Sequence, residues 1–162
     1  MNSLDTLIQD LVIANRILAR EAVVDAYGHV SVRHPEDPSR FLIARSVSPE
    51  LVTAADIVEL GLDGQPVGDD KRALYLERFI HAAIFEARPE VMAVVHAHAE
   101  DTLAFGVADM TKLRPVIHSG ALSGPRCRSG TSPITSARPI CSSPIWGRAA
   151  IWPNVSAAIT WR

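Results

Sequence analysis

The sequence has no acidic residue after Asp109, although 18 acidic residues precede or include that position. It has only two cysteines, Cys127 and Cys141, which are too few for a disulfide framework and lack a zinc-ribbon spacing, so we interpret them as incidental. A net charge of -2 gives no overall basic field, which argues against nucleic-acid and membrane partners. No apolar run approaches about 18 residues, and the N-terminus, with Asp5 and Asp10, lacks a signal-peptide pattern. We therefore expect a soluble cytoplasmic protein.

The composition divides the chain near residue 121. The segment 122–162 contains every tryptophan and both cysteines, has arginine but no lysine, and is interrupted by five prolines. Prolines at that density prevent a long helix, and no stretch alternates cleanly enough for a strand. We predict one domain over residues 1–121 and an irregular Arg/Ser/Pro/Trp-rich tail over 122–162.

The tail also has the character of a shifted reading frame. Residues 126–162 can be back-translated with GC-rich codons, and the resulting DNA can be read in a frame that starts two bases later. One of the peptides that this shifted frame can encode contains the acidic residues and the apolar periodicity that the tail lacks. We hypothesise a frameshift near residues 120–126. An intact reading frame at the locus, with homologous tails in close relatives, would contradict it.

The first part of the chain alternates between helical and strand patterns, which predicts a layered α/β domain with an antiparallel or mixed sheet. Asp63-Gly64 is a hairpin turn signal. The expected helices cover residues 3–21, 72–87 and 99–105, and the expected strands cover 30–33, 41–44, 57–62, 65–67 and 91–98.

The pair His96-Ala97-His98 ends the apolar run 91–95. Side chains two apart on a strand share a face, so both imidazoles can bind one metal ion. Open α/β sheets commonly place sites at strand ends. The alternative is two ordinary polar residues at the end of a strand.

Further candidates surround this pair in the sequence. Glu77 lies four residues before His81 on the expected helix, and its carboxylate could ligate a metal or transfer a proton, or simply pair on the helix surface. Three other positions are candidate substrate-binding groups: Gly28 with His29, Arg45 with Ser46, and His118. The alternatives are a turn at Gly28, a solvated loop at Arg45 and Ser46, and a structural histidine at His118.

The order and spacing of five segments resemble the class II aldolase/adducin family, over about three quarters of the chain. The segments are GHVSVR at 28–33, DIVE at 56–59 with DG at 63–64, ERFIH at 77–81, RP at 88–89 and VVHAH at 94–98.

The resemblance implies a three-layer α/β/α fold and a carbon–carbon lyase that binds a divalent metal, most often zinc, with manganese, cobalt or magnesium as alternatives. By the same resemblance, His96 and His98 are metal ligands and Glu77 is the catalytic acid/base. The metal holds adjacent substrate oxygens and stabilises an enediolate as the bond breaks. The resemblance also implies a homo-oligomer, often a tetramer.

Two departures from the family pattern bear on function. Arg45-Ser46 and Tyr75-Leu76 stand where sugar-phosphate aldolases have Thr-Gly and Ser-Ser pairs, which favours an unphosphorylated hydroxy or oxo acid over a sugar phosphate, with Arg45 as carboxylate partner. No histidine follows His118, so the family's later third ligand is missing. The alternative to an enzyme is therefore a non-catalytic, adducin-like interaction module or an inactive gene fragment.

Overall fold

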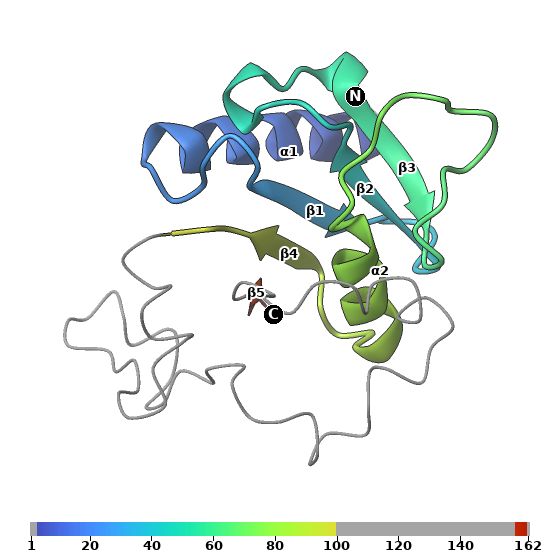
Figure 1. The fold of residues 1–162 in the computed structure, drawn as a ribbon. Helices are drawn as coiled ribbons and strands as arrows, with labels where there is room; N and C mark the ends of the chain where they lie inside the picture. Colours follow the sequence, from blue (N-terminus) through green and yellow to red (C-terminus); the bar gives the residue numbers. More distant parts are fainter. Residues whose placement is uncertain (1–2, 100–157, 162) are drawn as a thin grey trace, which may run out of the picture.

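The computed structural model describes residues 3–99 and 158–161 of the chain (Figure 1). None of the helices in these residues is long and apolar enough to span a membrane. In chain order the elements are α1 (Ser3–Arg20), β1 (His29–Arg33), β2 (Arg40–Ala44), the short 3-10 helices η1 (Pro49–Leu51) and η2 (Ala54–Asp56), β3 (Ile57–Gly61), α2 (Arg78–Ala87), β4 (Ala93–His96) and β5 (Ala158–Trp161).

The five strands form one sheet in the order β3-β2-β1-β4-β5, and each pairing among the described residues is antiparallel. Ser31 at the centre of β1 lies opposite Ile43 on β2 and Val94 on β4. The expected antiparallel sheet is therefore confirmed. Within the predicted tail, the structure describes only residues 158–161, which pair with β4.

The two faces of the sheet are covered by different helices, so the domain has three layers (Figure 1). Leu11 of α1 packs with Val30 and Leu42 on one face. Phe85 of α2 packs on the other face, where its ring lies 5.3 Å from that of Phe41. Each fully buried side chain of this size stabilises the fold by about 1.5–3 kcal/mol, which holds both helices on the sheet. The predicted α/β/α class is confirmed.

Strand β1 has one apolar and one polar face, because side chains alternate along a strand. Val30 and Val32 face α1, whereas His29, Ser31 and Arg33 face α2 and are buried there. The polar face is the part of the fold that positions the site.

Arg33 ties the end of α2 to the sheet. Its guanidinium donates hydrogen bonds to the carbonyl oxygens of Phe85 and Arg88 at the end of α2, and to those of Pro38 and Val91 in neighbouring loops. The Arg33 guanidinium also lies 4.8 Å from the centroid of the Phe85 ring. Buried carbonyl groups need such partners, so Arg33 satisfies four of them at once.

The predicted helix over 72–87 is too long at its start, since α2 begins at Arg78. The backbone before it has other partners: the carbonyl of Ala73 accepts the amide of Ser46, and the hydroxyl of Tyr75 bonds to the carbonyl of Val47. These tertiary contacts override the local helical pattern. Glu77 consequently occupies the N-cap of α2 rather than its interior.

Other predicted boundaries also differ from the structure. The strand expected over 91–98 is β4, which ends at His96. Gly64, at φ 73°, makes the predicted turn after β3, but the strand expected over 65–67 is reduced to an isolated bridge between Leu60 and Pro66. The helix expected over 99–105 lies outside the described residues from position 100 onward.

Candidate functional site

Histidines from two strands and one helix come together between the sheet and α2. The register of β1 and β4 places His29 directly opposite His96. His81 of α2 packs over them, with its Nδ1 2.6 Å from the Ser31 hydroxyl oxygen. These three histidines and Ser31 are buried. Four polar side chains thus meet in the interior between α2 and the two strands β1 and β4.

His96 and His98 face each other at this end of β4. Their rings are perpendicular, with centroids 4.7 Å apart, and their Nε2 atoms are 3.0 Å apart. Nitrogen ligands about 2.0–2.1 Å from a tetrahedral zinc ion lie roughly 3.3 Å from each other. The spacing and the chemistry of the two nitrogens therefore fit adjacent ligands of one metal ion.

Asp25 is the hydrogen-bond partner of the Nδ1 atom of His98. The Nδ1 atom of His98 lies 3.2 Å and 3.3 Å from the two carboxylate oxygens of Asp25. A carboxylate accepts, so Nδ1 is the donor and Nε2 of His98 keeps its lone pair. His96 and His98 together therefore offer two nitrogen ligands to a metal ion. No group of three or more His, Cys, Asp or Glu side chains within residues 3–99 and 158–161 is arranged to hold a metal ion.

His96 is part of a cluster of stacked rings that has His29 at its centre. The ring of His29 stacks on Tyr75 at 4.1 Å, on His81 at 4.8 Å and on His96 at 5.1 Å between centroids. His29 donates its Nδ1 proton to the carbonyl oxygen of Tyr27. In the described structure, Nε2 of His29, Nε2 of His81 and Nδ1 of His96 are buried without a hydrogen-bond partner.

Burial keeps these imidazoles neutral. It is the main reason that the pKa of His29 falls to about 3, with His96 and His98 acting in the same direction and the hydrogen bond to Tyr27 opposing them. Burial also holds the pKa of His81 well below its ordinary value. The pKa of His96 is lowered by burial and by His98, against opposing contributions from Glu77 and Asp25. Neutral imidazoles are the form that binds metal.

Glu77 lies beside this cluster, at the start of α2. Its side chain is half-buried, does not cap the helix, and makes no hydrogen bond or ion pair within the described part of the chain. The Glu77 carboxylate is close enough to His96 to raise the pKa of that histidine, and to Tyr75 to raise the pKa of its phenol alongside the larger effect of burial. A carboxylate so placed is available to exchange protons.

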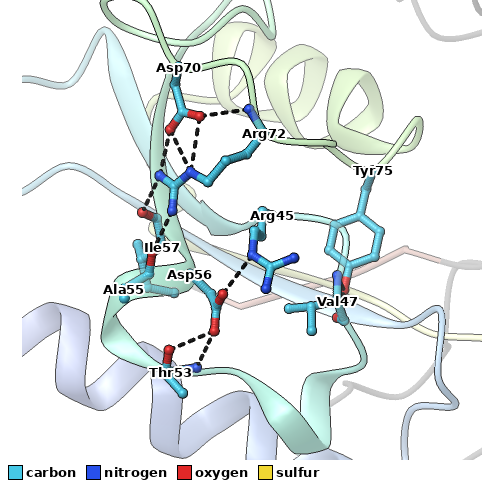
Figure 2. A network of polar contacts seen from close by, with 9 residues as sticks. All are labelled: Arg45, Val47, Thr53, Ala55, Asp56, Ile57, Asp70, Arg72 and Tyr75. Carbon is cyan, nitrogen blue, oxygen red and sulfur yellow. Dashed lines mark hydrogen bonds and ion pairs between the residues drawn. The ribbon is translucent and has the colours of Figure 1, made fainter.

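Figure 2 shows Arg45 between Asp56 and Tyr75. The Nε atom of Arg45 donates to Asp56 at 2.6 Å, and the other oxygen of Asp56 accepts from the amide and hydroxyl of Thr53. The hydrogen bonds from Thr53 and from Arg45 lower the pKa of Asp56 below its ordinary value. The terminal nitrogens of Arg45 make no hydrogen bond to any described residue, so they can bind an anion.

Two further residues predicted to bind substrate, Ser46 and Gly28, lie among the described residues. Ser46 is exposed, and its amide donates to the carbonyl of Ala73. A Cβ atom on Gly28 would lie 2.5 Å from Cβ of Val24 and 3.0 Å from the carbonyl oxygen of His96, so packing accounts for this glycine. His118 lies outside the described residues.

Four members of the site escape prediction from sequence: Asp25, Ser31, Tyr75 and His81. Asp25 and His98 are 73 positions apart, and only the folded loop before β1 brings them together. The available signal was an aspartate three residues before Gly28, which is typical of an Asx turn. The turn is present, because the amides of Tyr27 and Gly28 donate to Asp25.

Comparison with known proteins identifies a family and several relatives. A family model described as "Class II Aldolase and Adducin N-terminal domain" matches residues 9–140. The chain is 42% identical over 110 residues to decarboxylase tropJ of Talaromyces stipitatus, covering 67% of this chain and 41% of the relative. It is 28% identical over 134 residues to 3,4-dihydroxyphthalate decarboxylase of Arthrobacter keyseri, covering 76% and 52%.

A solved structure agrees with the family match. The crystal structure of an aldolase II superfamily protein from Pseudomonas syringae superposes with a TM-score of 0.66 at 31% sequence identity. The superposition covers 76% of this chain and 51% of that one. The chain thus spans about half the length of the proteins it matches.

Proposed function

This chain belongs to the class II aldolase and adducin N-terminal domain family, and we propose that it is a divalent-metal-dependent lyase acting on a small hydroxy or oxo acid. Two of the relatives above carry the name decarboxylase. Loss of carbon dioxide is therefore the favoured form of carbon–carbon cleavage, with aldol cleavage of a sugar-derived substrate as the other form.

His96 and His98 would hold the metal through their facing Nε2 atoms. Zinc suits two imidazole donors, and Mn²⁺, Co²⁺ and Mg²⁺ are the alternatives. A bound divalent cation supplies an electrophile that stabilises negative charge on substrate oxygens as the bond breaks. His96 is buried and neutral, so binding a cation through Nε2 requires only that its single ring proton move to Nδ1.

Glu77 is proposed as the group that transfers the proton. The carbanion left by cleavage must be protonated, or a hydroxyl proton must be removed first, depending on the direction of the reaction. Glu77 has no competing partner among the described residues and lies beside the metal-ligand pair. Those properties allow its carboxyl group to take up and release a proton during each turnover.

Arg45 is proposed as the partner of a substrate carboxylate. Asp56 holds the guanidinium through Nε and leaves the two terminal nitrogens for a planar anion. Tyr75 occupies the corresponding position of a phosphate cradle, yet its hydroxyl is bonded to the carbonyl of Val47. The arrangement therefore favours a carboxylate over a phosphate ester.

His29, Gly28, Ser46 and His118 complete the proposed substrate site. The Nδ1 proton of His29 is committed to Tyr27, so its Nε2 can only accept a hydrogen bond. A substrate group paired with it must be a donor such as a hydroxyl. We also propose a homo-oligomer, a tetramer by family resemblance.

The observation that carries the proposal is the 3.0 Å approach of the His96 and His98 Nε2 atoms. The test is elemental analysis of the purified full chain after exposure to Zn²⁺, beside the His96→Ala, His98→Ala double variant. Near-stoichiometric zinc is expected in the wild type and its loss in the double variant. His34→Ala is the matched control, because among the described residues the His34 ring accepts hydrogen bonds only from the loop amides of Glu36 and Asp37.

Activity is then assayed as carbon dioxide release from unphosphorylated hydroxy and oxo acids, and as aldol cleavage of their phosphorylated counterparts. A chain that binds no divalent metal would contradict the enzyme and favour a non-catalytic, adducin-like interaction module.

A further inference from the structure

Asp25 accepts hydrogen bonds from two parts of the site. Its Oδ1 atom lies 3.0 Å from the Tyr27 amide and 2.8 Å from the Gly28 amide, both in the loop that leads into β1. Both carboxylate oxygens lie within 3.3 Å of Nδ1 of His98, beyond β4. Every one of these partners is a nitrogen that can donate a proton, so both oxygens of Asp25 act as acceptors.

The contact with His98 determines which nitrogen of that ring is free. A proton on Nδ1 satisfies the carboxylate, which leaves Nε2 unprotonated and 3.0 Å from Nε2 of His96. A carboxylate behind a histidine ligand fixes both its tautomer and its ring orientation. We propose that Asp25 is a positioning residue that holds His98 in its metal-binding form, an inference that rests on the proposed function.

The same carboxylate also orders the residues leading to His29. By binding the Tyr27 and Gly28 amides, it sets the turn whose Tyr27 carbonyl accepts the Nδ1 proton of His29. Gly28 in this turn packs against the His96 carbonyl. One side chain thus orients imidazoles on both sides of His96.

The two tasks of Asp25 have different chemical requirements. An Asx turn needs one oxygen acceptor, which asparagine supplies equally well. The imidazole contact uses both oxygens, Oδ2 at 3.2 Å and Oδ1 at 3.3 Å, together with the negative charge, and Asp25→Asn loses the Oδ2 contact and the charge while keeping Oδ1. In Asp25→Asn an amide NH₂ replaces one of these oxygens. This variant therefore retains the turn and removes the carboxylate from His98.

The first experiment measures Zn²⁺ affinity of the full chain by competition with a chromophoric chelator. Asp25→Asn is expected to bind roughly 10–100-fold more weakly than the wild type, with an unchanged melting temperature in the presence of EDTA. Asp37→Asn is the matched control: Asp37 makes a comparable turn with the Ser39 amide and contacts no metal-binding histidine. Equal affinity of Asp25→Asn and wild type would overturn the proposal.

The second experiment needs no metal and separates this proposal from the proposed function. Long-range ¹H–¹⁵N NMR of the metal-free chain at about pH 8, where an ordinary histidine is neutral, reports the tautomer of His98. The Nδ1-protonated form is expected in the wild type and in Asp37→Asn, and a shift toward the Nε2-protonated form in Asp25→Asn. An unchanged tautomer overturns the positioning role. A wild type that binds no Zn²⁺ overturns the proposed function instead.

Discussion

The imidazole of His29 lies nearly parallel to the phenol ring of Tyr75, with 13° between the ring planes and 4.1 Å between centroids. The His29 ring also stacks on His81 and His96, so side chains from β1, β4, α2 and the loop before α2 meet in one buried cluster. Aromatic pairs at such distances contribute about 0.5–1.5 kcal/mol beyond their buried area. The stack therefore links the stability of the domain to the protonation of its histidines.

Acid is expected to destabilise the domain well before its carboxylates titrate. The unfolded chain binds a proton at His29 near pH 6.5, whereas the folded chain resists until pH about 3. The unfolding free energy should be constant above pH 7 and fall between pH 6.5 and 4.5, by about 1.4 kcal/mol per pH unit for each histidine kept neutral. Urea unfolding at a series of pH values measures this slope.

His29→Phe provides the comparison for the acid series, because phenylalanine retains a ring against Tyr75 but cannot be protonated. Its slope between pH 6.5 and 4.5 should be smaller than that of the wild type by one histidine's contribution. Equal slopes would show that His29 is not protected from protons in the folded chain.

Replacing Arg33 is expected to weaken the whole domain. Arg33→Met leaves the carbonyls of Pro38, Phe85, Arg88 and Val91 without their donor. Unpaired buried polar groups cost about 1–3 kcal/mol each, and partial access of water reduces the sum, so we expect a loss of roughly 3–5 kcal/mol. Denaturant midpoints measure it.

Arg20→Met is the control for this prediction, since the Arg20 side chain is 87% exposed and pairs only loosely with Glu21 at 4.0 Å. It should change the unfolding free energy by less than about 0.5 kcal/mol. Similar effects of the two substitutions would refute the anchoring role of Arg33.

Gly28→Ala is expected to disturb the site as well as the fold. The new methyl would meet Cβ of Val24, which cannot rotate away, and the backbone oxygen of His96. Overpacking of this kind costs roughly 1–3 kcal/mol and should weaken Zn²⁺ binding by displacing β4. In Gly61→Ala the one contact under 3.0 Å among the described residues is with the Asp63 carboxylate oxygen, at the movable end of a side chain. Thermal melts that rank Gly61→Ala as the more damaging change would contradict this explanation.

Glu77→Gln is expected to reduce catalysis without unfolding the chain or releasing metal. Loss of a general acid or base lowers kcat by about 10²–10⁴-fold, while KM should change little because the amide keeps the shape of the side chain. Steady-state kinetics, paired with zinc content, separate these effects. Glu86→Gln, at an exposed position of α2, is the control. Wild-type kcat in Glu77→Gln would exclude a role in proton transfer.

The sequence predicted a helix or strand well where the residues of that element alone determine its structure. The alternation of Val30 and Val32 with polar residues identified β1, and helical spacing identified α1 to within one residue of its end at Arg20. The start of α2 was not predictable, because the backbone before Arg78 is held by Ser46 and Val47 from a distant loop. Such contacts carry no signal in the local sequence.

The candidate site likewise contains residues that a local pattern predicts and residues that only the tertiary fold brings together. His96 and His98 could be named from their spacing, since a strand places alternate residues on one face. The Asp25 partner of His98 and the burial of His29 between Tyr75 and His81 depend on how loops and layers pack. The roles of Glu77 and Arg45 stay predictions.

The two-faced character of β1 also bears on how the chain finds its strand pairing. A slip of one residue would turn His29, Ser31 and Arg33 against the aliphatic side chains of α1 and expose Val30 to the polar interior. Burying an unpaired guanidinium costs several kcal/mol, so the misaligned sheet is strongly disfavoured. The side chains near the proposed metal therefore also select the native register, and a descendant that no longer used a metal would still need this polar strand in order to fold.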